Sequence, residues 1–155
     1  MSEIRIRRAT KRDIDTILLL AKALQDFHTN LDSYYGIYDE FEDHRIFYEE
    51  ELENDERLYL IASVDGKDVA FASASVIHID DEDAPKIGYL IAVYVREAFR
   101  ERGIGTLLYE ERVEWLKEQG VSYIEMSVDV RNKNVLKRYK ERGFREYKVN
   151  LVKKI

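Results

Sequence analysis

The feature that most constrains this chain is the apolar segment at residues 86–95, with the sequence KIGYLIAVYV. A strand that faces solvent on one side alternates apolar and polar residues, whereas this segment is apolar on both faces after its first residue. Such a strand is typical of a sheet that is covered on two sides. The segment therefore predicts a mixed α/β fold with helices on both faces of a sheet.

The rest of the chain supplies the other elements of such a fold. Alternating or turn-bounded apolar runs predict strands at residues 4–8, on both sides of the Asp65-Gly66 turn within 57–77, and at 86–95, 121–130 and 145–155. Apolar residues at helical spacing, with Thr10 and Asp13 as a capping box before the first helix, predict helices at 12–27, 42–54, 103–119 and 132–144. We expect these elements to form one domain over residues 1–155.

A glycine-rich turn follows the central strand, in the stretch FRERGIGTLL at residues 99–108. Gly103 and Gly105 leave the first N–H groups of the next helix open to an anion, and Arg100 and Arg102 add positive charge. The turn follows the carboxyl end of a strand, where ligands bind in open α/β sheets. It lacks the third glycine of a dinucleotide fingerprint and the Gly-Lys of a P-loop. It therefore predicts a pyrophosphate cradle, with a merely structural strand-to-helix turn as the alternative.

Composition excludes several kinds of protein. The 155 residues contain no cysteine, which rules out disulfides and thiolate chemistry and is typical of a reducing compartment. No apolar run approaches the roughly 18 residues of a membrane span, and the amino terminus lacks the apolar core of a signal peptide. The three histidines are scattered, so we expect no metal site. These features predict a cytoplasmic protein without membrane association.

The net charge of −6 hides a split between two parts of the chain. Residues 1–95 carry 10 Lys and Arg against 21 Asp and Glu, whereas residues 96–155 carry 15 against 10. The acidic part is suited to a cationic ligand and the basic part to a polyanionic one, with solvated helix faces as the alternative explanation. No basic tract is clustered enough to predict nucleic-acid binding.

Three motifs in the second half of the chain carry a resemblance to a known family. Residues 100–105 match the pattern Q/R-x-x-G-x-G/A, and Asn132, Tyr139 and Gly143-Phe144 follow at the expected separations. This combination, together with the amino-terminal IRIRRATKRDIDTILLL, resembles the GCN5-related N-acetyltransferase (GNAT) superfamily. The resemblance implies an enzyme that transfers an acetyl group from acetyl-CoA to an amine. It also implies a mixed sheet of six or seven strands with four flanking helices and splayed central strands, and it favours a homodimer.

The resemblance assigns residues to coenzyme A. Val93, Tyr94 and Val95 would pair with its extended arm, as an added strand does. Asn132 and Tyr139 would lie beside the arm and the thioester. The residues that would hold the pyrophosphate, mainly through backbone N–H groups, are those of the glycine turn: Arg100, Glu101, Arg102, Gly103, Ile104, Gly105 and Thr106.

The resemblance also gives Tyr139 the role of proton donor to the leaving thiolate, because a phenol and a thiol have similar acidity. Packing is the alternative for this tyrosine. The general base is less well defined, since the position where related N-terminal acetyltransferases often carry Glu or His is Ser127 here. Tyr89, with Glu125 or Asp129 on the polar face of the neighbouring strand, would instead hold a water that accepts the proton.

The aromatic and acidic segment after the first helix is the expected acceptor site. Tyr34, Tyr35, Tyr38 and Phe41 offer ring faces to a cation, and acidic residues surround them. Core packing or a dimer contact is the alternative for some of these rings. Together with Ser127, they predict a small cationic amine, such as a polyamine or an amino sugar. The alternative functions are a protein N-terminal or lysine acetyltransferase and a non-catalytic acyl-CoA sensor.

Overall fold

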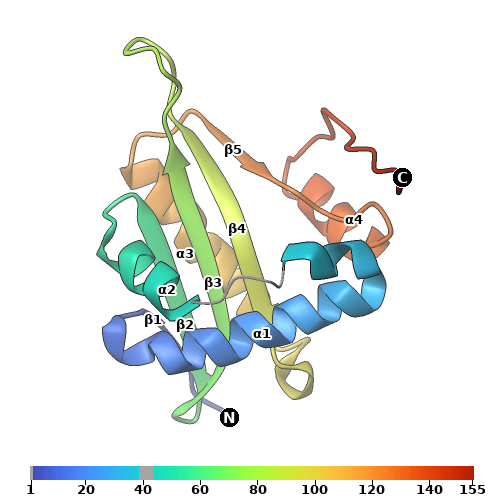
Figure 1. The fold of residues 1–155 in the computed structure, drawn as a ribbon. Helices are drawn as coiled ribbons and strands as arrows, with labels where there is room; N and C mark the ends of the chain where they lie inside the picture. Colours follow the sequence, from blue (N-terminus) through green and yellow to red (C-terminus); the bar gives the residue numbers. More distant parts are fainter. Residues whose placement is uncertain (1, 39–43) are drawn as a thin grey trace.

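The computed structural model describes residues 2–38 and 44–155 and shows a sheet between two layers of helices (Figure 1). The described strands lie side by side in chain order: β1 (Ile4–Arg8), β2 (Arg57–Val64), β3 (Lys67–Ile77), β4 (Ile87–Val95) and β5 (Tyr123–Met126). The first four are antiparallel, and β5 is parallel to β4. The helices are α1 (Ile14–Leu31), α2 (His44–Glu53), α3 (Ile104–Glu118) and α4 (Lys133–Glu141), with short 3-10 helices η1 (Lys11–Asp13), η2 (Ser33–Tyr38) and η3 (Glu97–Phe99). None of the described helices combines the length and the apolar character needed to cross a membrane.

Each face of the sheet has its own hydrophobic core, because alternate residues of a strand point to opposite sides. On one face, Tyr59, Ile61 and Phe71 form a buried cluster with Ile17 and Leu20 of α1. On the other face, the strands pack against α3 and α4 through a larger set that includes Leu60, Ala72, Leu90, Leu108, Leu116 and Tyr139. The predicted α/β fold, with a sheet covered on both faces, is confirmed.

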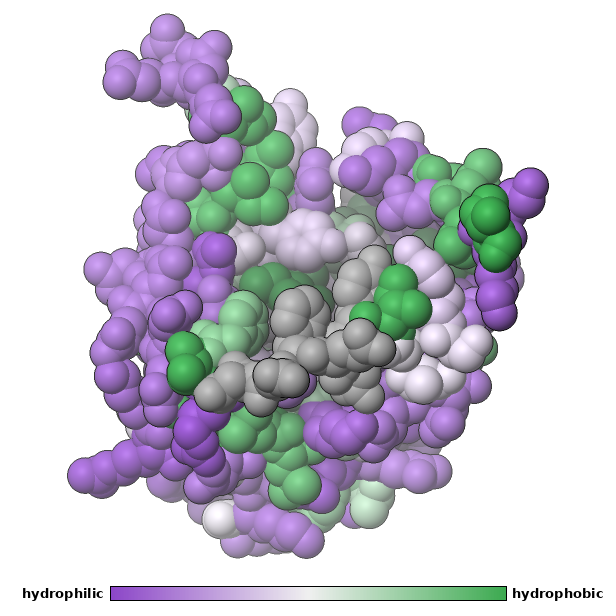
Figure 2. All heavy atoms as spheres, viewed as in Figure 1, coloured by the Kyte–Doolittle hydropathy of each residue, from purple (hydrophilic) through white to green (hydrophobic). Residues whose placement is uncertain are grey.

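Two segments predicted as strands differ in the structure. Strand β5 ends at Met126, so residues 127–130 leave the sheet. Residues 145–155 form no strand, and their apolar side chains are exposed on the right of the molecule in Figure 2, with Leu151 93% accessible. The alternating pattern of this segment is correct for a strand, but a strand also needs a partner edge, and the neighbouring β5 offers four residues. The described sheet therefore has five strands rather than six or seven.

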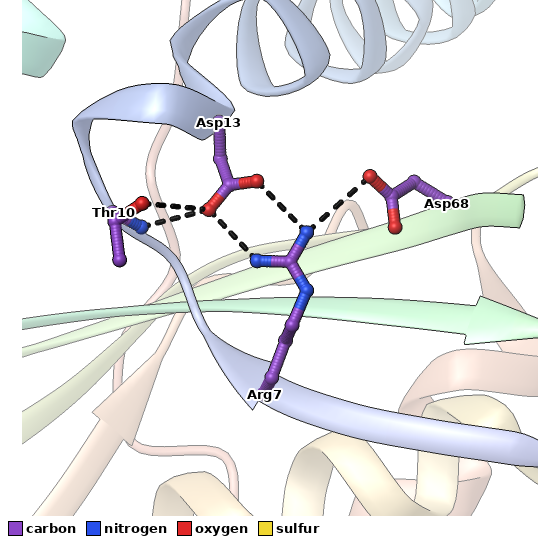
Figure 3. A network of polar contacts seen from close by, with 4 residues as sticks. All are labelled: Arg7, Thr10, Asp13 and Asp68. Carbon is purple, nitrogen blue, oxygen red and sulfur yellow. Dashed lines mark hydrogen bonds and ion pairs between the residues drawn. The ribbon is translucent and has the colours of Figure 1, made fainter. Parts of the chain in front are cut away.

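The start of α1 is fixed by Asp13, which is buried beside β1 (Figure 3). Its carboxylate accepts two hydrogen bonds of 2.8 Å from the Arg7 guanidinium and one of 2.8 Å from the Thr10 backbone N–H. Asp68 of β3 also accepts a longer bond of 3.4 Å from Arg7. The predicted capping box is confirmed. It joins the edge strand, the third strand and the first helix into one network.

We expect Asp13→Asn to lower the free energy of unfolding by about 1–3 kcal/mol at pH 7, because the variant breaks a buried charge-assisted pair. The bonds from Arg7 hold the pKa of Asp13 below its usual range. The stabilisation is therefore present above the ordinary aspartate pKa and is lost as the pH falls through the lower, folded pKa. Denaturant unfolding at several pH values measures this difference.

The matched control is Asp15→Asn, because Asp15 lies on the same helix and forms an exposed surface pair with Arg45. It should change the free energy of unfolding by less than about 0.5 kcal/mol. Equal effects of the two substitutions, or an Asp13 effect that persists in acid, would contradict the assigned role of this network.

Candidate active site

The last two strands of the described sheet, β4 and β5, part along their length, as the splayed arrangement requires. Strands β4 and β5 are in parallel register from Ile87 opposite Tyr123 to Leu90 opposite Met126. Beyond this point β4 continues to Val95, whereas β5 ends and the chain turns away toward α4 (Figure 1). The edge of β4 that includes Val93, Tyr94 and Val95 therefore has no strand beside it on this side among the described residues. An extended ligand with amide groups can pair with such an edge.

A β-bulge lies in β4 where the strands part. Across β3 and β4, Ser73 is opposite Ala92 and Ala74 is opposite Leu90, so Ile91 is an extra residue without a partner. A bulge locally disrupts the ladder and redirects the backbone groups and side chains around it. It places irregular backbone at the mouth of the opening between β4 and β5.

The glycine turn forms a tight path from η3 into α3. Glu101 and Gly103 have positive φ angles of 61° and 82°, which Gly103 adopts without strain and which are unusual for a residue such as Glu101. The Leu107 N–H donates to the Gly103 carbonyl at 3.1 Å, which is the first hydrogen bond of the helix. The N–H groups before Leu107 therefore have no partner within the helix and lie at the positive end of its dipole. A Cβ placed on Gly103 or Gly105 meets no heavy atom within 4 Å, so the space beside these N–H groups is open.

The two arginines of the turn fold back onto the chain. Arg100 Nε donates to the Val95 carbonyl at 2.9 Å, and its guanidinium lies over the Tyr94 ring. Arg102 Nη2 donates to the Ala98 carbonyl at 3.2 Å. These bonds brace the turn, which leaves the backbone N–H groups as the donors that face a ligand. The turn thus fits a diphosphate by its backbone.

A further cation, which the sequence did not point to, lies at the start of α3. Arg142 Nη2 donates to the Thr106 hydroxyl at 3.2 Å, and the guanidinium stacks on the Tyr109 ring at 4.0 Å. Arg142 directly precedes the Gly143-Phe144 motif, but its position in the sequence does not reveal a contact 36 residues away. It adds positive charge beside the glycine turn.

Tyr139 of α4 is buried in the hydrophobic core on the α3 face of the sheet. It is 6% exposed, and its ring meets the rings of Tyr109 and Phe144 edge to face, with centroids 5.8 Å and 5.4 Å away. Asn132 precedes the same helix, and its backbone carbonyl accepts the Leu136 N–H at 3.0 Å, without a capping bond from its side chain. The ring of Tyr139 is therefore held in one orientation by its neighbours.

Tyr89 and Ser127 meet where the strands part. The Tyr89 hydroxyl is 2.8 Å from the Ser127 hydroxyl, and Glu125 is opposite Tyr89 in the parallel register. The two hydroxyl groups therefore meet where the strands part, with Glu125 at the neighbouring register position. The chemistry available there is the binding and relay of a proton through hydroxyl groups, a carboxylate or a water.

Asp129 belongs to a different network. Its carboxylate accepts hydrogen bonds from Arg131 Nε at 2.9 Å, Arg131 Nη2 at 2.7 Å and the Tyr35 hydroxyl at 2.7 Å. The Arg131 guanidinium, assisted by Tyr35, holds the pKa of Asp129 well below its usual range. Because Arg131 and Tyr35 stabilise its ionised form, Asp129 is a weaker proton acceptor than an unpaired carboxylate.

The same network joins the aromatic segment to the loop after β5. Tyr35 of η2 stacks on His28 at 5.0 Å, and Arg131 also pairs with Asp32 at 3.2 Å. Tyr34 is 40% exposed beside them. Phe41 lies outside the described residues, and the side chain of Tyr38 is not described. The structure therefore brings Tyr35, with Tyr34 beside it, to the loop that follows β5.

Comparison with known proteins connects this geometry to one family. The acetyltransferase (GNAT) family model matches residues 23–144. An uncharacterized N-acetyltransferase of Methanocaldococcus jannaschii is 32% identical over 145 residues, which are 93% of this chain and 62% of the relative. This chain thus spans less than two thirds of that relative's length. An N-alpha-acetyltransferase of Sulfurisphaera tokodaii is 28% identical over 153 residues, 95% of this chain and 83% of the relative.

Solved structures share the fold at lower identity. An aminoglycoside N-acetyltransferase in complex with CoA superposes with a TM-score of 0.76 at 24% identity, over 99% of this chain and 96% of that one. An aminoglycoside acetyltransferase from a soil metagenomic sample, in complex with sisomicin, gives 0.73 at 14% identity, over 98% and 96% of the two chains. At this level of identity the likeness concerns the fold, and the family follows from the sequence comparisons. The chain that carries the parted strands and the glycine turn belongs to the acetyltransferase (GNAT) family.

Proposed function

We propose that this chain is an N-acetyltransferase that transfers the acetyl group of acetyl-CoA to a primary amine. The observation that carries the proposal is that two surfaces with unpaired backbone groups follow one another along the chain. These are the edge of β4 after Leu90 and the N–H groups at the start of α3. The first is suited to an extended chain with amide groups, and the second to a diphosphate. Coenzyme A contains both in one molecule. The family and the relatives named N-acetyltransferases support the same activity.

The residues that would hold acetyl-CoA follow from these surfaces. Val93, Tyr94 and Val95 would bind the arm, and Asn132 would contact it from the start of α4. The diphosphate would lie on the glycine turn, at Arg100, Glu101, Arg102, Gly103, Ile104, Gly105 and Thr106. Bound there, acetyl-CoA would supply an activated acyl group at the opening between β4 and β5.

Two proton transfers then fall to residues of this chain. An amine with a pKa near 10 is almost entirely protonated at neutral pH, so it must lose a proton before it can attack. Tyr89 and Ser127, with Glu125 opposite, would hold the water that takes this proton. Tyr139 would donate its hydroxyl proton to the leaving sulfur and recover it from solvent.

The acceptor that fits best is a small cationic amine, such as a polyamine or an amino sugar. The stretch from Asp26 to Asp55 has 11 acidic residues and one basic residue, Arg45, and it includes η2 beside the loop that follows β5. Aromatic faces at Tyr34 and Tyr35 also favour a cation. The solved structures named as aminoglycoside acetyltransferases act on molecules of this kind, according to their names.

A protein amino terminus is the second candidate acceptor. The observation that favours it is the Sulfurisphaera tokodaii relative, which is named an N-alpha-acetyltransferase and matches nearly the whole chain. Ser127 speaks against it, because a serine cannot act as the base that Glu or His provides at this position in related enzymes. A sensor that binds acyl-CoA without turnover is the third candidate, and the hydroxyl of Tyr139 would have no task in it.

The test measures free thiol release from acetyl-CoA with spermidine, an amino sugar and amino-terminal peptides at equal amine concentrations. We expect release that depends on spermidine or the amino sugar, with the acetylated amine identified by mass. Release with peptides alone would assign the second function instead. Calorimetric binding of CoA without any amine-dependent release would assign the sensor, and the absence of both would exclude all three.

A further inference from the structure

Arg112 of α3 is a buried cation. Its exposed fraction is 1%, and no carboxylate of the described residues forms an ion pair with it. Its Nη2 atom is buried and has no hydrogen-bond partner among residues 2–38 and 44–155. The buried Asp13, by contrast, is paired with Arg7. Removing a charge from water without pairing it destabilises a fold, so stability alone does not explain an arginine here.

The other donors of Arg112 lie at the bulge of β4. Its Nη1 donates to the carbonyl oxygens of Ser73 at 3.3 Å and Ala92 at 3.2 Å. These two residues are opposite each other immediately before the register shift that leaves Ile91 unpaired. Its Nε donates to the Leu108 carbonyl one turn earlier in α3, at 3.2 Å. Arg112 therefore clamps β4 to β3 and to α3 at the β-bulge in β4.

The same guanidinium lies beside Tyr139. Burial lowers the pKa of Arg112 from its ordinary value, and the nearby Tyr139 hydroxyl opposes this shift. Because the ordinary value is so high, the guanidinium remains charged near neutral pH. One positive charge thus bonds to the irregular segment of β4 and lies near the candidate proton donor.

We propose that Arg112 is a positioning residue for acyl transfer. It fixes the β4 bulge through Ser73 and Ala92, so that this irregular backbone faces the group that reacts where β4 and β5 part. Its positive charge also favours the negative charge that develops when the thioester carbonyl is attacked and the sulfur leaves. The inference rests on the proposed function, because it assigns Arg112 to that reaction.

A purely structural role predicts a different result. An arginine that only satisfied carbonyl groups would, when removed, lower the melting temperature and leave kcat per folded molecule unchanged. For a positioning residue, we expect Arg112→Met, which keeps a similar side-chain volume, to lower kcat by about 10- to 100-fold. The KM for acetyl-CoA should change less than kcat, because the glycine turn that would hold the diphosphate is unaltered. Arg112→Lys retains the charge and should recover part of the lost kcat.

The experiment compares these two variants with Arg5→Met, which removes an exposed arginine paired with Glu3 on the edge strand. Melting temperature, CoA affinity, kcat and KM are measured for each, with amide hydrogen exchange at Ile91 and Ala92. Lower kcat and faster exchange in Arg112→Met, with partial rescue in Arg112→Lys and no change in Arg5→Met, support the proposal. An unchanged kcat in folded Arg112→Met overturns it.

The proposed function can also fail separately, if the wild-type chain acetylates no amine. In that case unchanged amide exchange at the β4 bulge in Arg112→Met would overturn the role of Arg112 in holding the bulge as well.

Discussion

The variant Tyr139→Phe is expected to fold normally and to lose about 100-fold or more in kcat for acyl transfer. Phenylalanine keeps the buried ring and its edge-to-face contacts with Tyr109 and Phe144, so the packing around α4 is preserved. The substitution removes the hydroxyl, and the loss of a general acid costs about 10²- to 10⁴-fold. Amine-dependent thiol release gives kcat, and thermal unfolding shows whether the fold is intact.

Tyr109→Phe is the matched control, because Tyr109 has the same side chain and contacts the same aromatic group. Its half-buried hydroxyl has no assigned role in the reaction, so kcat should change by less than about threefold. Two tyrosine variants with equal loss of kcat would point to a packing effect. A Tyr139→Phe enzyme with wild-type kcat would remove Tyr139 from the proposed mechanism.

The elements that the sequence predicted well are those set by local rules. The Asp65-Gly66 hairpin is an example, since both residues have positive φ angles of 50° and 81°, as a tight turn between twisted strands requires. The capping box of Thr10 and Asp13 and the glycine turn are equally local. Residues 145–155 show the limit of such rules, because an alternating pattern does not reveal whether a neighbouring strand is long enough to pair with it.

Residues of the candidate site could be predicted where a local sequence motif contains them. They could not be predicted where their role depends on a contact between segments that are distant in the sequence. Gly103 was identified from the glycine turn and Tyr139 from the family resemblance, and the structure places Gly103 at the start of α3 and Tyr139 against Tyr109 of the same helix. Asp129 was a candidate base because it shares a strand face with Ser127. In the structure its carboxylate accepts hydrogen bonds from Arg131 and from Tyr35, which lies 94 residues earlier.

Arg112 was not identified, since a single arginine in an amphipathic helix is usually exposed. Only the packing of α3 on the β4 bulge distinguishes it.

The variant Gly105→Val should raise the dissociation constant of CoA by about 10- to 100-fold without loss of stability. Gly105 lies in the first turn of α3, its φ is not positive, and a Cβ there meets nothing within 4 Å. Valine therefore fits, and it is a slightly better helix residue than glycine. Its side chain would occupy the space in front of the N–H groups and displace a diphosphate. Each charge-assisted hydrogen bond lost is worth about 1.5–3 kcal/mol, which gives the expected change in affinity.

Gly103→Ala and Gly120→Ala form a matched pair that separates ligand binding from backbone strain. Both glycines have φ near +80°, at 82° and 78°, and open space for a Cβ, so both variants should lose about 1–2 kcal/mol of stability. Gly103 lies in the turn, whereas Gly120 lies at the opposite end of α3. Calorimetric titration with CoA should therefore show weaker binding for Gly103→Ala and unchanged binding for Gly120→Ala. Wild-type affinity in both Gly105→Val and Gly103→Ala would mean that the diphosphate binds elsewhere, because neither the added side chains nor the altered turn would then touch it.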